Sequence, residues 1–284
     1  MTSVQDPDKD QTTTKETSSS YNSQVSNMVL EIPHCLHMTV LAIAKQVKLL
    51  RKLTQQSKHD AKMHFELEAR LGTYAGNSFT PGVNYETLEH IQRMLESYDN
   101  WDSMSPQWVE MHDYFYPSPT IEGGNIRSTV QFQPDSARKS IDIGHLLKKR
   151  LSKLDVAYQG EGTESAYNMR FTLAQEVTID KDDVPDIVKP QYIRIKKRRE
   201  FSKGCWRFDL TKTWSGATRI EAEQKMNSEP IYEVEVECID PKSYLSQDYH
   251  TDQYVATSIL VKLLDFVMLP PTYTLVPIKD GGDQ

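Results

Sequence analysis

Six segments of the chain alternate apolar and polar residues with a period of two, and the polar positions are largely ionic. In FELEARLG, residues 65–72, Glu66, Glu68 and Arg70 are separated by Leu67 and Ala69. Such alternation predicts β-strands that have one apolar face and one charged face. The other five segments are 126–132, 167–179, 191–201, 206–214 and 231–239, with polar faces of Arg127, Thr129 and Gln131; Arg170, Thr172 and Glu176; Arg194, Lys196 and Arg198; Arg207, Asp209 and Thr211; and Glu233, Glu235 and Glu237.

Two of these faces carry charges of a single sign, and this restricts how the sheet can close. Three glutamates in register repel one another and stay ionised only when cations are near. A sandwich that exposed these faces to water would normally mix the signs of its surface charges. A closed barrel of about eight strands or more instead lets acidic faces confront basic faces across a polar lumen. We therefore predict an α+β, mainly β fold in which antiparallel strands form a closed tunnel barrel with a charged lumen.

Three amphipathic helices are predicted to cover the outward apolar faces of this barrel. The first begins at Pro33 and repeats apolar residues at helical spacing as far as Leu53. The second follows Asn84, a good N-cap residue. The third starts with Asp252 as its cap and ends before Pro270 and the proline that follows it.

The chain of 284 residues is expected to form one folded domain with polar ends. Residues 1–26 are predicted to be a disordered polar tail, residues 27–270 the tunnel domain, and residues 271–284 a C-terminal extension. Within the domain, residues 99–122 are interpreted as a strand or two with loops. The N-terminal residues contain no apolar run, so neither a secretion signal nor a membrane span is expected, and the default location is the cytosol or nucleus.

Charge and motif content exclude several classes of protein. The net charge of −7 argues against a protein that coats long nucleic acids, although it permits one that grips a single end. The three cysteines are far apart in sequence and predict neither a zinc site nor disulfides. The chain has no Gly-rich Walker loop and no Gly-x-Ser-x-Gly elbow, which argues against a P-loop NTPase and an α/β-hydrolase.

A lumen with acids on one wall and bases on another suits a phosphorylated ligand and a metal ion. Arginine and lysine bind phosphoryl oxygens, and a hard divalent ion binds carboxylates and bridges to phosphate. This combination serves phosphoryl transfer or hydrolysis, which depends on positioning and charge neutralisation. We therefore expect a metal ion to lie between Glu66 and Glu68.

Four motifs taken in order resemble a known family. They are Glu-x-Glu-x-Arg near the start, Arg-x-Lys-x-Arg followed closely by Arg-x-Asp-x-Thr, and Glu-x-Glu-x-Glu near the end. Together they resemble the metal-dependent RNA 5′-triphosphatases of fungal, protozoan and viral mRNA capping, which belong to the triphosphate tunnel metalloenzymes. The resemblance covers roughly residues 27–270 and implies an eight-stranded antiparallel tunnel. It also implies removal of the γ-phosphate from triphosphate-ended RNA, the first step of cap formation.

The resemblance also implies roles for single residues. Mg²⁺ or Mn²⁺ would be held by Glu66, Glu68 and Glu237, within an acidic wall completed by Glu233 and Glu235. Phosphates would be gripped by Arg127, Lys196, Arg198 and Arg207, with Asp209 holding one of these bases in place and Glu176 orienting the attacking water. Substrate contacts and lumen support would come from Arg70, Arg170, Arg194, Thr211, Lys148 and Arg150, with Lys149 facing inward instead if the register of that strand slips by one residue.

Other proteins and alternative substrates follow from the same resemblance. The chain lacks a Lys-x-Asp-Gly nucleotidyl-transfer motif, so a separate guanylyltransferase is expected to complete the cap. The expected partner is the 5′ end of RNA rather than DNA or a membrane, the expected location is the nucleus, and NTP hydrolysis with Mn²⁺ or Co²⁺ is a further expectation. Arg70 stands where many tunnel enzymes have lysine. Two alternatives remain: an inorganic tripolyphosphatase or thiamine triphosphatase of the same fold, and a non-catalytic polyanion-binding module.

Overall fold

The structure is a computed structural model, and the part of the chain that it describes comprises residues 34–57, 60–75, 78–118, 125–132, 139–159, 167–184, 189–267 and 274–278. The predicted tail, residues 1–26, lies outside these residues, as does most of the predicted C-terminal extension. No helix in the described ranges is long and apolar enough to cross a membrane.

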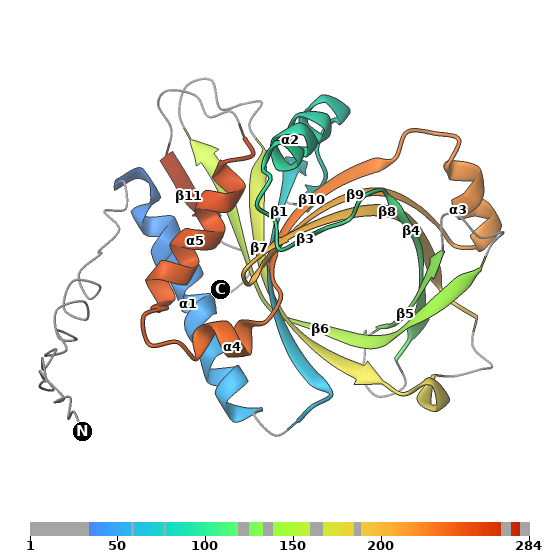
Figure 1. The fold of residues 1–284 in the computed structure, drawn as a ribbon, viewed down its shortest axis with the longest axis horizontal. Helices are drawn as coiled ribbons and strands as arrows, with labels where there is room; N and C mark the ends of the chain where they lie inside the picture. Colours follow the sequence, from blue (N-terminus) through green and yellow to red (C-terminus); the bar gives the residue numbers. More distant parts are fainter. Residues whose placement is uncertain are drawn as a thin grey trace, which may run out of the picture. The chain divides into compact units, whose positions relative to one another are not determined.

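A closed antiparallel barrel of eight strands forms the centre of the fold (Figure 1). Strand β1 closes the ring because Glu68 pairs with Thr172 of one neighbouring strand and with Glu237 of the other. The predicted barrel is therefore confirmed, and all six alternating segments are barrel strands. In order around the barrel the strands are β1 (Met63–Ala75), β10 (Ile231–Cys238), β9 (Trp206–Gly216), β8 (Tyr192–Lys203), β4 (Val109–Pro117), β5 (Asn125–Phe132), β6 (Ser140–Gln159) and β7 (Asn168–Ile179).

Three short strands extend this sheet. Strand β2 (Ser78–Pro81) pairs with β1, β3 (Ser103–Met104) pairs with β8, and β11 (Thr274–Ile278) pairs with β6. The interpretation of residues 99–122 as a strand or two is borne out by β3 and β4. Strand β11 is the described portion of the predicted C-terminal extension, and its pairing with β6 joins it to the sheet.

The three predicted helices are present, together with two short helices that periodicity could not reveal. The elements are α1 (His34–Gln56), α2 (Tyr85–Ser97), α3 (Arg219–Lys225), α4 (Pro241–Leu245), α5 (Asp252–Leu264) and a 3-10 turn at Lys181–Asp183. Asn84 caps α2 as predicted, because its side chain accepts a hydrogen bond from the backbone of Thr87. The prediction of Asp252 as the cap of α5 is wrong: Thr251 accepts from the backbone of Tyr254, which makes Asp252 the first helical residue.

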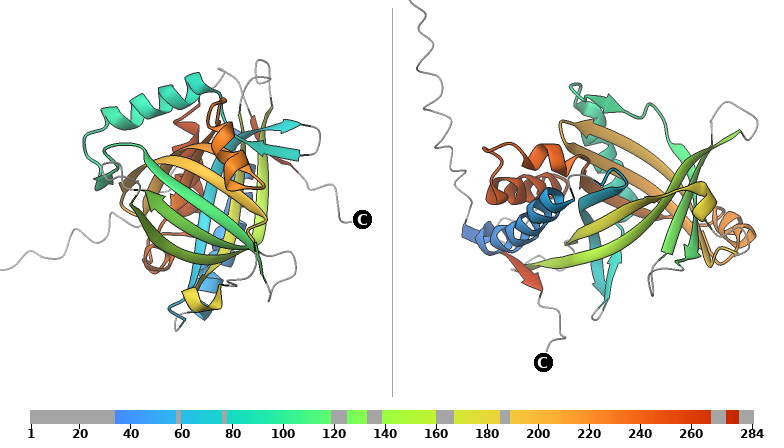
Figure 2. Two further views of the ribbon diagram at one scale, coloured as in Figure 1. Left: turned by 90° about the vertical axis from the view of Figure 1, so that its right-hand side faces the viewer. Right: turned by 90° about the horizontal axis from the view of Figure 1, so that it is seen from below.

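The hydrophobic core lies outside the barrel, between its wall and the helices. Helices α1, α4 and α5 lie against one side of the barrel (Figure 1, and the right view of Figure 2). Leu67 and Leu71, which point outward from β1, are fully buried in one cluster with Ile43 of α1 and Ile259 of α5. Because the apolar faces are buried on the outside, the opposite faces of the same strands must line the lumen.

This placement of the core predicts how substitutions in α1 affect stability. Replacement of the fully buried Ile43 by alanine should lower the free energy of unfolding by about 2–5 kcal/mol, through lost burial and the cavity left behind. Leu49 on the same helix is 38% exposed, and Leu49→Ala should cost less than about 1 kcal/mol. Equilibrium unfolding in urea measures both values, and equal costs would contradict the assignment of the core to the helix–barrel interface.

Candidate active site in the barrel lumen

The strand register gathers the predicted charged faces in the lumen. Around the barrel wall, Arg70 pairs with Glu235, and Glu235 pairs with Asp209 on the next strand. Ion pairs also reach past a neighbouring strand, from Lys148 of β6 to Glu66 of β1 and from Arg194 of β8 to Glu233 of β10. Acidic and basic side chains therefore meet inside a closed wall, as the alternation predicts.

Lys148 lies between the carboxylates of two strands. Its ammonium group contacts Glu66 and lies 3.5 Å from an oxygen of Glu68 and 3.7 Å from an oxygen of Glu176. The guanidinium of Arg127 lies 3.6 Å from the same Glu176 oxygen. Burial lowers the pKa of Lys148, but the three carboxylates outweigh it and hold the pKa above its ordinary value. This lysine is therefore a permanent cation at the acidic end of the site.

Arg70 bridges two other carboxylates, and these two respond differently. A single nitrogen of Arg70 lies 3.0 Å from Glu68 and 3.0 Å from Glu235. Burial disfavours the ionised form of Glu235, but Arg70, Arg198 and Arg194 overcome it and lower its pKa to about 2. Burial raises the pKa of Glu68 above its ordinary value despite Arg70. The positive charge around Glu235 thus outweighs the cost of burying its ionised carboxylate, whereas the positive charge around Glu68 does not.

Asp113 is a central residue of the basic wall that the sequence analysis missed. Its side chain is completely buried and accepts hydrogen bonds from Arg194 at 2.9 Å and from Thr129 at 2.8 Å. Lys196 lies 2.9 Å from the same carboxylate. Burial opposes its ionisation, but Lys196, Arg194 and Arg127 hold the pKa of Asp113 well below its usual range. Asp113 therefore fixes two cations of β8 in position.

The sequence around Asp113 gives the wrong orientation for β4, because the inward face looks apolar and the outward face looks charged. In VEMHDYFYP the inward face carries Met111 and Phe115 beside Asp113, so it reads as the apolar face. The opposite face carries Glu110 and His112 and reads as the charged one. Period-two sorting alone therefore assigns the wrong face, and only the pairing of Asp113 with Arg194 on β8 and Thr129 on β5 decides the orientation.

Asp209 has the same positioning role on β9, which is separated from β4 by β8. It lies 3.1 Å from Nε of Arg207 and 3.4 Å from Arg198, and Arg207 also contacts Glu237. Asp209 is almost fully buried. Each of these two arginines is thus oriented by an aspartate and keeps further donors for a ligand.

Several buried polar atoms of the lumen lack a hydrogen-bond partner among the described residues. Buried polar groups are normally satisfied, so such atoms mark places where a ligand or water belongs. Three are guanidinium donors from three different strands, which suits an anion with many oxygens. The atoms are Nε of Arg70, Arg127 and Arg198, Oδ1 of Asp209 and Oγ1 of Thr211.

The carboxylates of β1 and β10 have the donor chemistry of a Mg²⁺ or Mn²⁺ site. Within the described ranges, no three carboxylate, histidine or cysteine side chains are already arranged to hold a metal ion, because cations occupy the spaces between them. Burial raises the pKa of Glu237 well above its ordinary value, and Glu66 and Glu68 raise it further. These three glutamates therefore lie close enough to repel, and oxygen ligands are what such ions prefer. The carboxylate oxygens of these glutamates are therefore chemically suited to bind Mg²⁺ or Mn²⁺.

The remaining predicted residues divide between the lumen and the surface. Glu233 and Glu235 are buried, and Thr211 lies on the lumen face between Glu233 and Arg198 in register. Arg170 is bound by both oxygens of Asp155, at 2.6 and 2.8 Å, and so is already neutralised. The structure does not bring Arg150 into the ionic cluster: Arg150 and Lys149 are exposed, and Arg150 borders a β-bulge, because the register of β6 shifts between Arg150 and Ser152.

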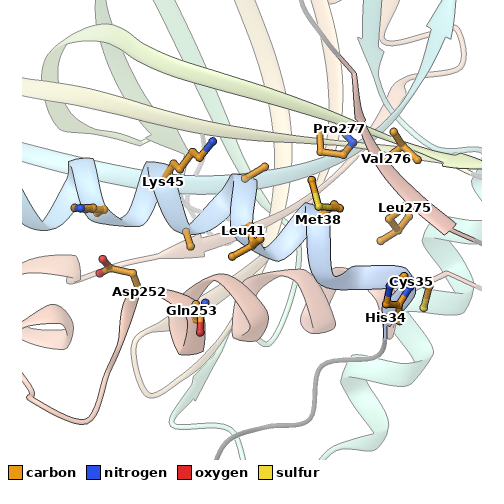
Figure 3. Close-up of a pocket in the computed structure, with 13 residues that line it drawn as sticks. His34, Cys35, Met38, Leu41, Lys45, Asp252, Gln253, Leu275, Val276 and Pro277 are labelled. Carbon is orange, nitrogen blue, oxygen red and sulfur yellow. The ribbon is translucent and has the colours of Figure 1, made fainter.

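A large groove of about 1070 Å³ lies elsewhere, outside the barrel between α1, α5 and β11 (Figure 3). Its lining is mainly apolar and includes Met38, Leu41, Leu275 and Pro277. None of the lumen carboxylates or arginines lines it. The candidate site is therefore identified by the converging charged and unsatisfied side chains of the lumen, and this groove is separate from it.

Comparison with known proteins agrees with the barrel fold. The family model described as mRNA capping enzyme, beta chain, matches residues 74–258. The match contains strands β4 to β10, while most of β1, with Glu66 and Glu68, precedes it. No curated protein matches the chain with significant sequence similarity.

Solved structures of two organisms are similar to this chain. The RNA triphosphatase Pct1 of S. pombe is 14% identical over 78% of this chain and 92% of that chain, with a TM-score of 0.53. Pct1 in complex with the Spt5 CTD is 15% identical over 78% and 91% of the two chains, with a TM-score of 0.53. A Mimivirus capping enzyme triphosphatase is 15% identical over 78% and 96%, with a TM-score of 0.48. The likeness to Pct1 shows that the two chains share a fold.

The environment of Lys196 predicts how the stability of the protein depends on pH. Burial and Arg198 lower the pKa of Lys196 from 10.5 to about 7, although Asp113 opposes the shift. Between pH 7 and 10.5 the unfolded chain therefore binds one proton more than the folded chain, so stability rises with pH in that window and this gain is absent below it. Relative to Lys196→Met, the free energy of unfolding of the wild type should rise by up to about 1.4 kcal/mol per pH unit.

Urea unfolding at several pH values across the window measures this difference. Lys197→Met is the matched control, because the Lys197 side chain is 40% exposed on the other face of the same strand. This control should keep the pH dependence of the wild type. Parallel curves for the wild type and Lys196→Met would contradict the burial of a destabilised ammonium group.

Proposed function

We propose that this chain, which belongs to the mRNA capping enzyme beta chain family, removes the γ-phosphate from the 5′-triphosphate end of nascent mRNA and leaves a diphosphate end. The observation that supports this most is the convergence of unsatisfied guanidinium donors of Arg70, Arg127 and Arg198 in a lumen that also holds a triple-glutamate strand. Such a lumen suits a substrate with several adjacent phosphates, because each phosphate supplies oxygens that accept from these donors.

Four cations are proposed to bind the phosphate chain. Arg127, Lys196, Arg198 and Arg207 come from three strands, and Asp113 and Asp209 hold three of them in place. Positions fixed before the substrate arrives cost little reorganisation when charge shifts during the reaction. A phosphate beside Lys196 also favours its charged form, so the lysine binds substrate as an ammonium ion.

The metal is proposed to be held by Glu66, Glu68 and Glu237, with Glu233 and Glu235 completing the acidic wall. When bound, a divalent ion neutralises phosphate oxygens and withdraws electron density from the phosphorus that is attacked. The protein's own contribution is to keep these carboxylates together in spite of their repulsion. Lys148 and Arg207, which contact Glu66 and Glu237, supply the positive charge that makes this possible.

Glu176 is proposed to orient the attacking water. Its carboxylate lies between Arg127 and Lys148, at 3.6 and 3.7 Å, at the edge of the phosphate-binding group. An ionised carboxylate accepts a hydrogen bond from water and aligns its lone pair with the phosphorus. Arg127 connects the two functions, since it contacts Glu176 and has a free Nε donor for phosphate.

Three further proposals concern the setting of the enzyme. A separate guanylyltransferase would add the cap to the diphosphate end, since this chain has no Lys-x-Asp-Gly motif. The protein would act in the nucleus, where nascent mRNA is made, or in the cytoplasm if capping occurs there. It would also hydrolyse free NTPs when Mn²⁺ or Co²⁺ is supplied, because an NTP carries the same triphosphate group that the lumen is proposed to bind.

Activity measurements on acidic variants test the reaction. Glu68→Gln and Glu237→Gln should each lower γ-phosphate release from triphosphate-ended RNA by about 100-fold or more, because each removes one charged oxygen ligand at nearly constant volume. Glu110→Gln is the control and should keep wild-type activity, since Glu110 points away from the lumen beside His112. Undiminished release by either lumen variant would refute the metal assignment.

Thermal unfolding with and without metal tests ion binding independently of turnover. Excess Mn²⁺ should raise the melting temperature of the wild type, because a ligand that binds only the folded state stabilises it. The rise should be reversed by a chelator and should be absent in Glu68→Gln. An equal rise in wild type and variant would place the bound ion elsewhere.

Substrate comparison separates the proposed function from its alternatives. A capping enzyme should release phosphate from triphosphate-ended RNA more efficiently, by kcat/KM, than from inorganic tripolyphosphate or thiamine triphosphate. The reverse order would identify a tripolyphosphatase or thiamine triphosphatase of the same fold. Binding of polyphosphate without phosphate release in Mg²⁺, Mn²⁺ or Co²⁺ would identify a non-catalytic polyanion-binding module.

A further inference from the structure

We infer that Phe115 of β4 and Tyr192 of β8 form a stacking platform for the first nucleobase of the substrate, at the end of the phosphate-binding group. The inference rests on the proposed function, because it assigns the nucleoside end of the same triphosphate substrate. It concerns two side chains that phosphate binding, metal binding and water orientation leave unused. It also explains why an aromatic pair lies on a lumen face that is otherwise rich in ions.

The strand register places this pair directly beside the phosphate-binding cations. Phe115 pairs with Tyr192 on one side and with Arg127 on the other. Two residues earlier on the same face of β4 lies Asp113, which pairs with Arg194. Residues two apart along a strand share a face and are separated by about 6.6–6.8 Å. The aromatic rings are therefore one such step beyond Asp113 and the arginine that it holds.

The rings have the geometry and exposure of a surface that accepts another flat group. Their centroids are 5.4 Å apart and their planes are inclined by 52°. The Arg194 guanidinium carbon lies 5.8 Å from the Phe115 centroid. Tyr192 is 42% exposed although it belongs to a barrel strand. Exposed aromatic rings beside cations are the combination by which proteins bind single-stranded nucleic acid, through base stacking and phosphate contacts.

A second aromatic pair, at the β1–β2 hairpin, differs because a side chain of the same protein already covers one of its rings. Tyr74 and Phe79 lie with centroids 5.8 Å apart, but Arg170 covers the Phe79 ring at 4.4 Å. Asp155 then binds Arg170 and also accepts a hydrogen bond from Tyr74. Phe79 is buried, and this group is closed by its own contacts. Among the described residues, no ion-pair group covers the 42% exposed Tyr192 ring in this way, which is why we assign the base to the Phe115–Tyr192 pair.

The platform determines the class of substrate rather than its sequence. Stacking uses the π-face that all bases share, so the first nucleotide is bound with little preference among bases. Inorganic tripolyphosphate has no base and gains nothing from the rings. The platform would therefore favour triphosphates of RNA and of nucleosides over inorganic tripolyphosphate, through binding rather than through the chemical step.

Kinetics of Tyr192→Ala and Phe115→Ala test the platform in the full-length enzyme. We expect KM to rise by about 5- to 100-fold for triphosphate-ended RNA and for an NTP, the range that loss of one base–aromatic stack produces. The value of kcat should stay near that of the wild type. KM for tripolyphosphate should change by less than about twofold, since no base is present. Tyr192→Phe keeps the ring and should restore the wild-type KM.

A control variant and an exposed test variant make the outcome decisive. Tyr249→Ala removes a 65% exposed tyrosine between α4 and α5 and should leave KM unchanged for all three substrates. Tyr192→Ala alters an exposed side chain, so it preserves the test if Phe115→Ala fails to fold. Equal changes of KM for RNA and tripolyphosphate, or no change for either, would overturn the platform while γ-phosphate release from RNA by the wild type upholds the proposed function. A wild type that cleaves tripolyphosphate but not RNA would instead overturn the proposed function itself.

Discussion

The compensation of buried charge inside a closed wall is the constraint on which the rest of this structure depends. Taking carboxylates and guanidinium groups out of water is costly unless each is paired and hydrogen-bonded. The barrel meets this cost by pairing opposite charges within and between strands, as Arg70 of β1 does with Glu68 of the same strand and Glu235 of β10. Asp113 does the same for Arg194 and Lys196 on the opposite wall. A sheet that did not close could not bring these strands within reach of one another.

A polar interior requires that the hydrophobic core lie elsewhere, and this explains the helices. The outward faces of β1 and β10 carry residues such as Leu67 and Val236, which are fully buried against α1 and α5. Burial of apolar surface is the main favourable term in folding, so the helix–barrel interface must offset the cost of the charged lumen. The helices therefore stabilise the barrel that holds the lumen side chains in place.

Much of this arrangement follows from the sequence, because strand alternation is a local property. The barrel, the faces of the six segments and the helices α1, α2 and α5 could be predicted in this way. What failed depended on pairing: Asp113 shares its face with Met111 and Phe115, and Arg150 borders the bulge in β6 and is exposed. Helices α3 and α4 have too few turns to show a period. The orientation of Asp113 and the exposure of Arg150 depend on neighbouring strands, and the sequence of one segment alone does not show how that segment pairs.

The pairing inside the lumen also explains why an acidic wall and a phosphate-binding wall belong to one site. Most of the lumen cations already have a carboxylate, so a polyanion that entered alone would have to compete with Glu66 for Lys148 and with Glu237 for Arg207. If Glu66 and Glu237 held a divalent cation, as proposed, this conflict would be removed, because Lys148 and Arg207 would then be available to phosphate. Under the proposed function, phosphate and metal would therefore favour each other's binding.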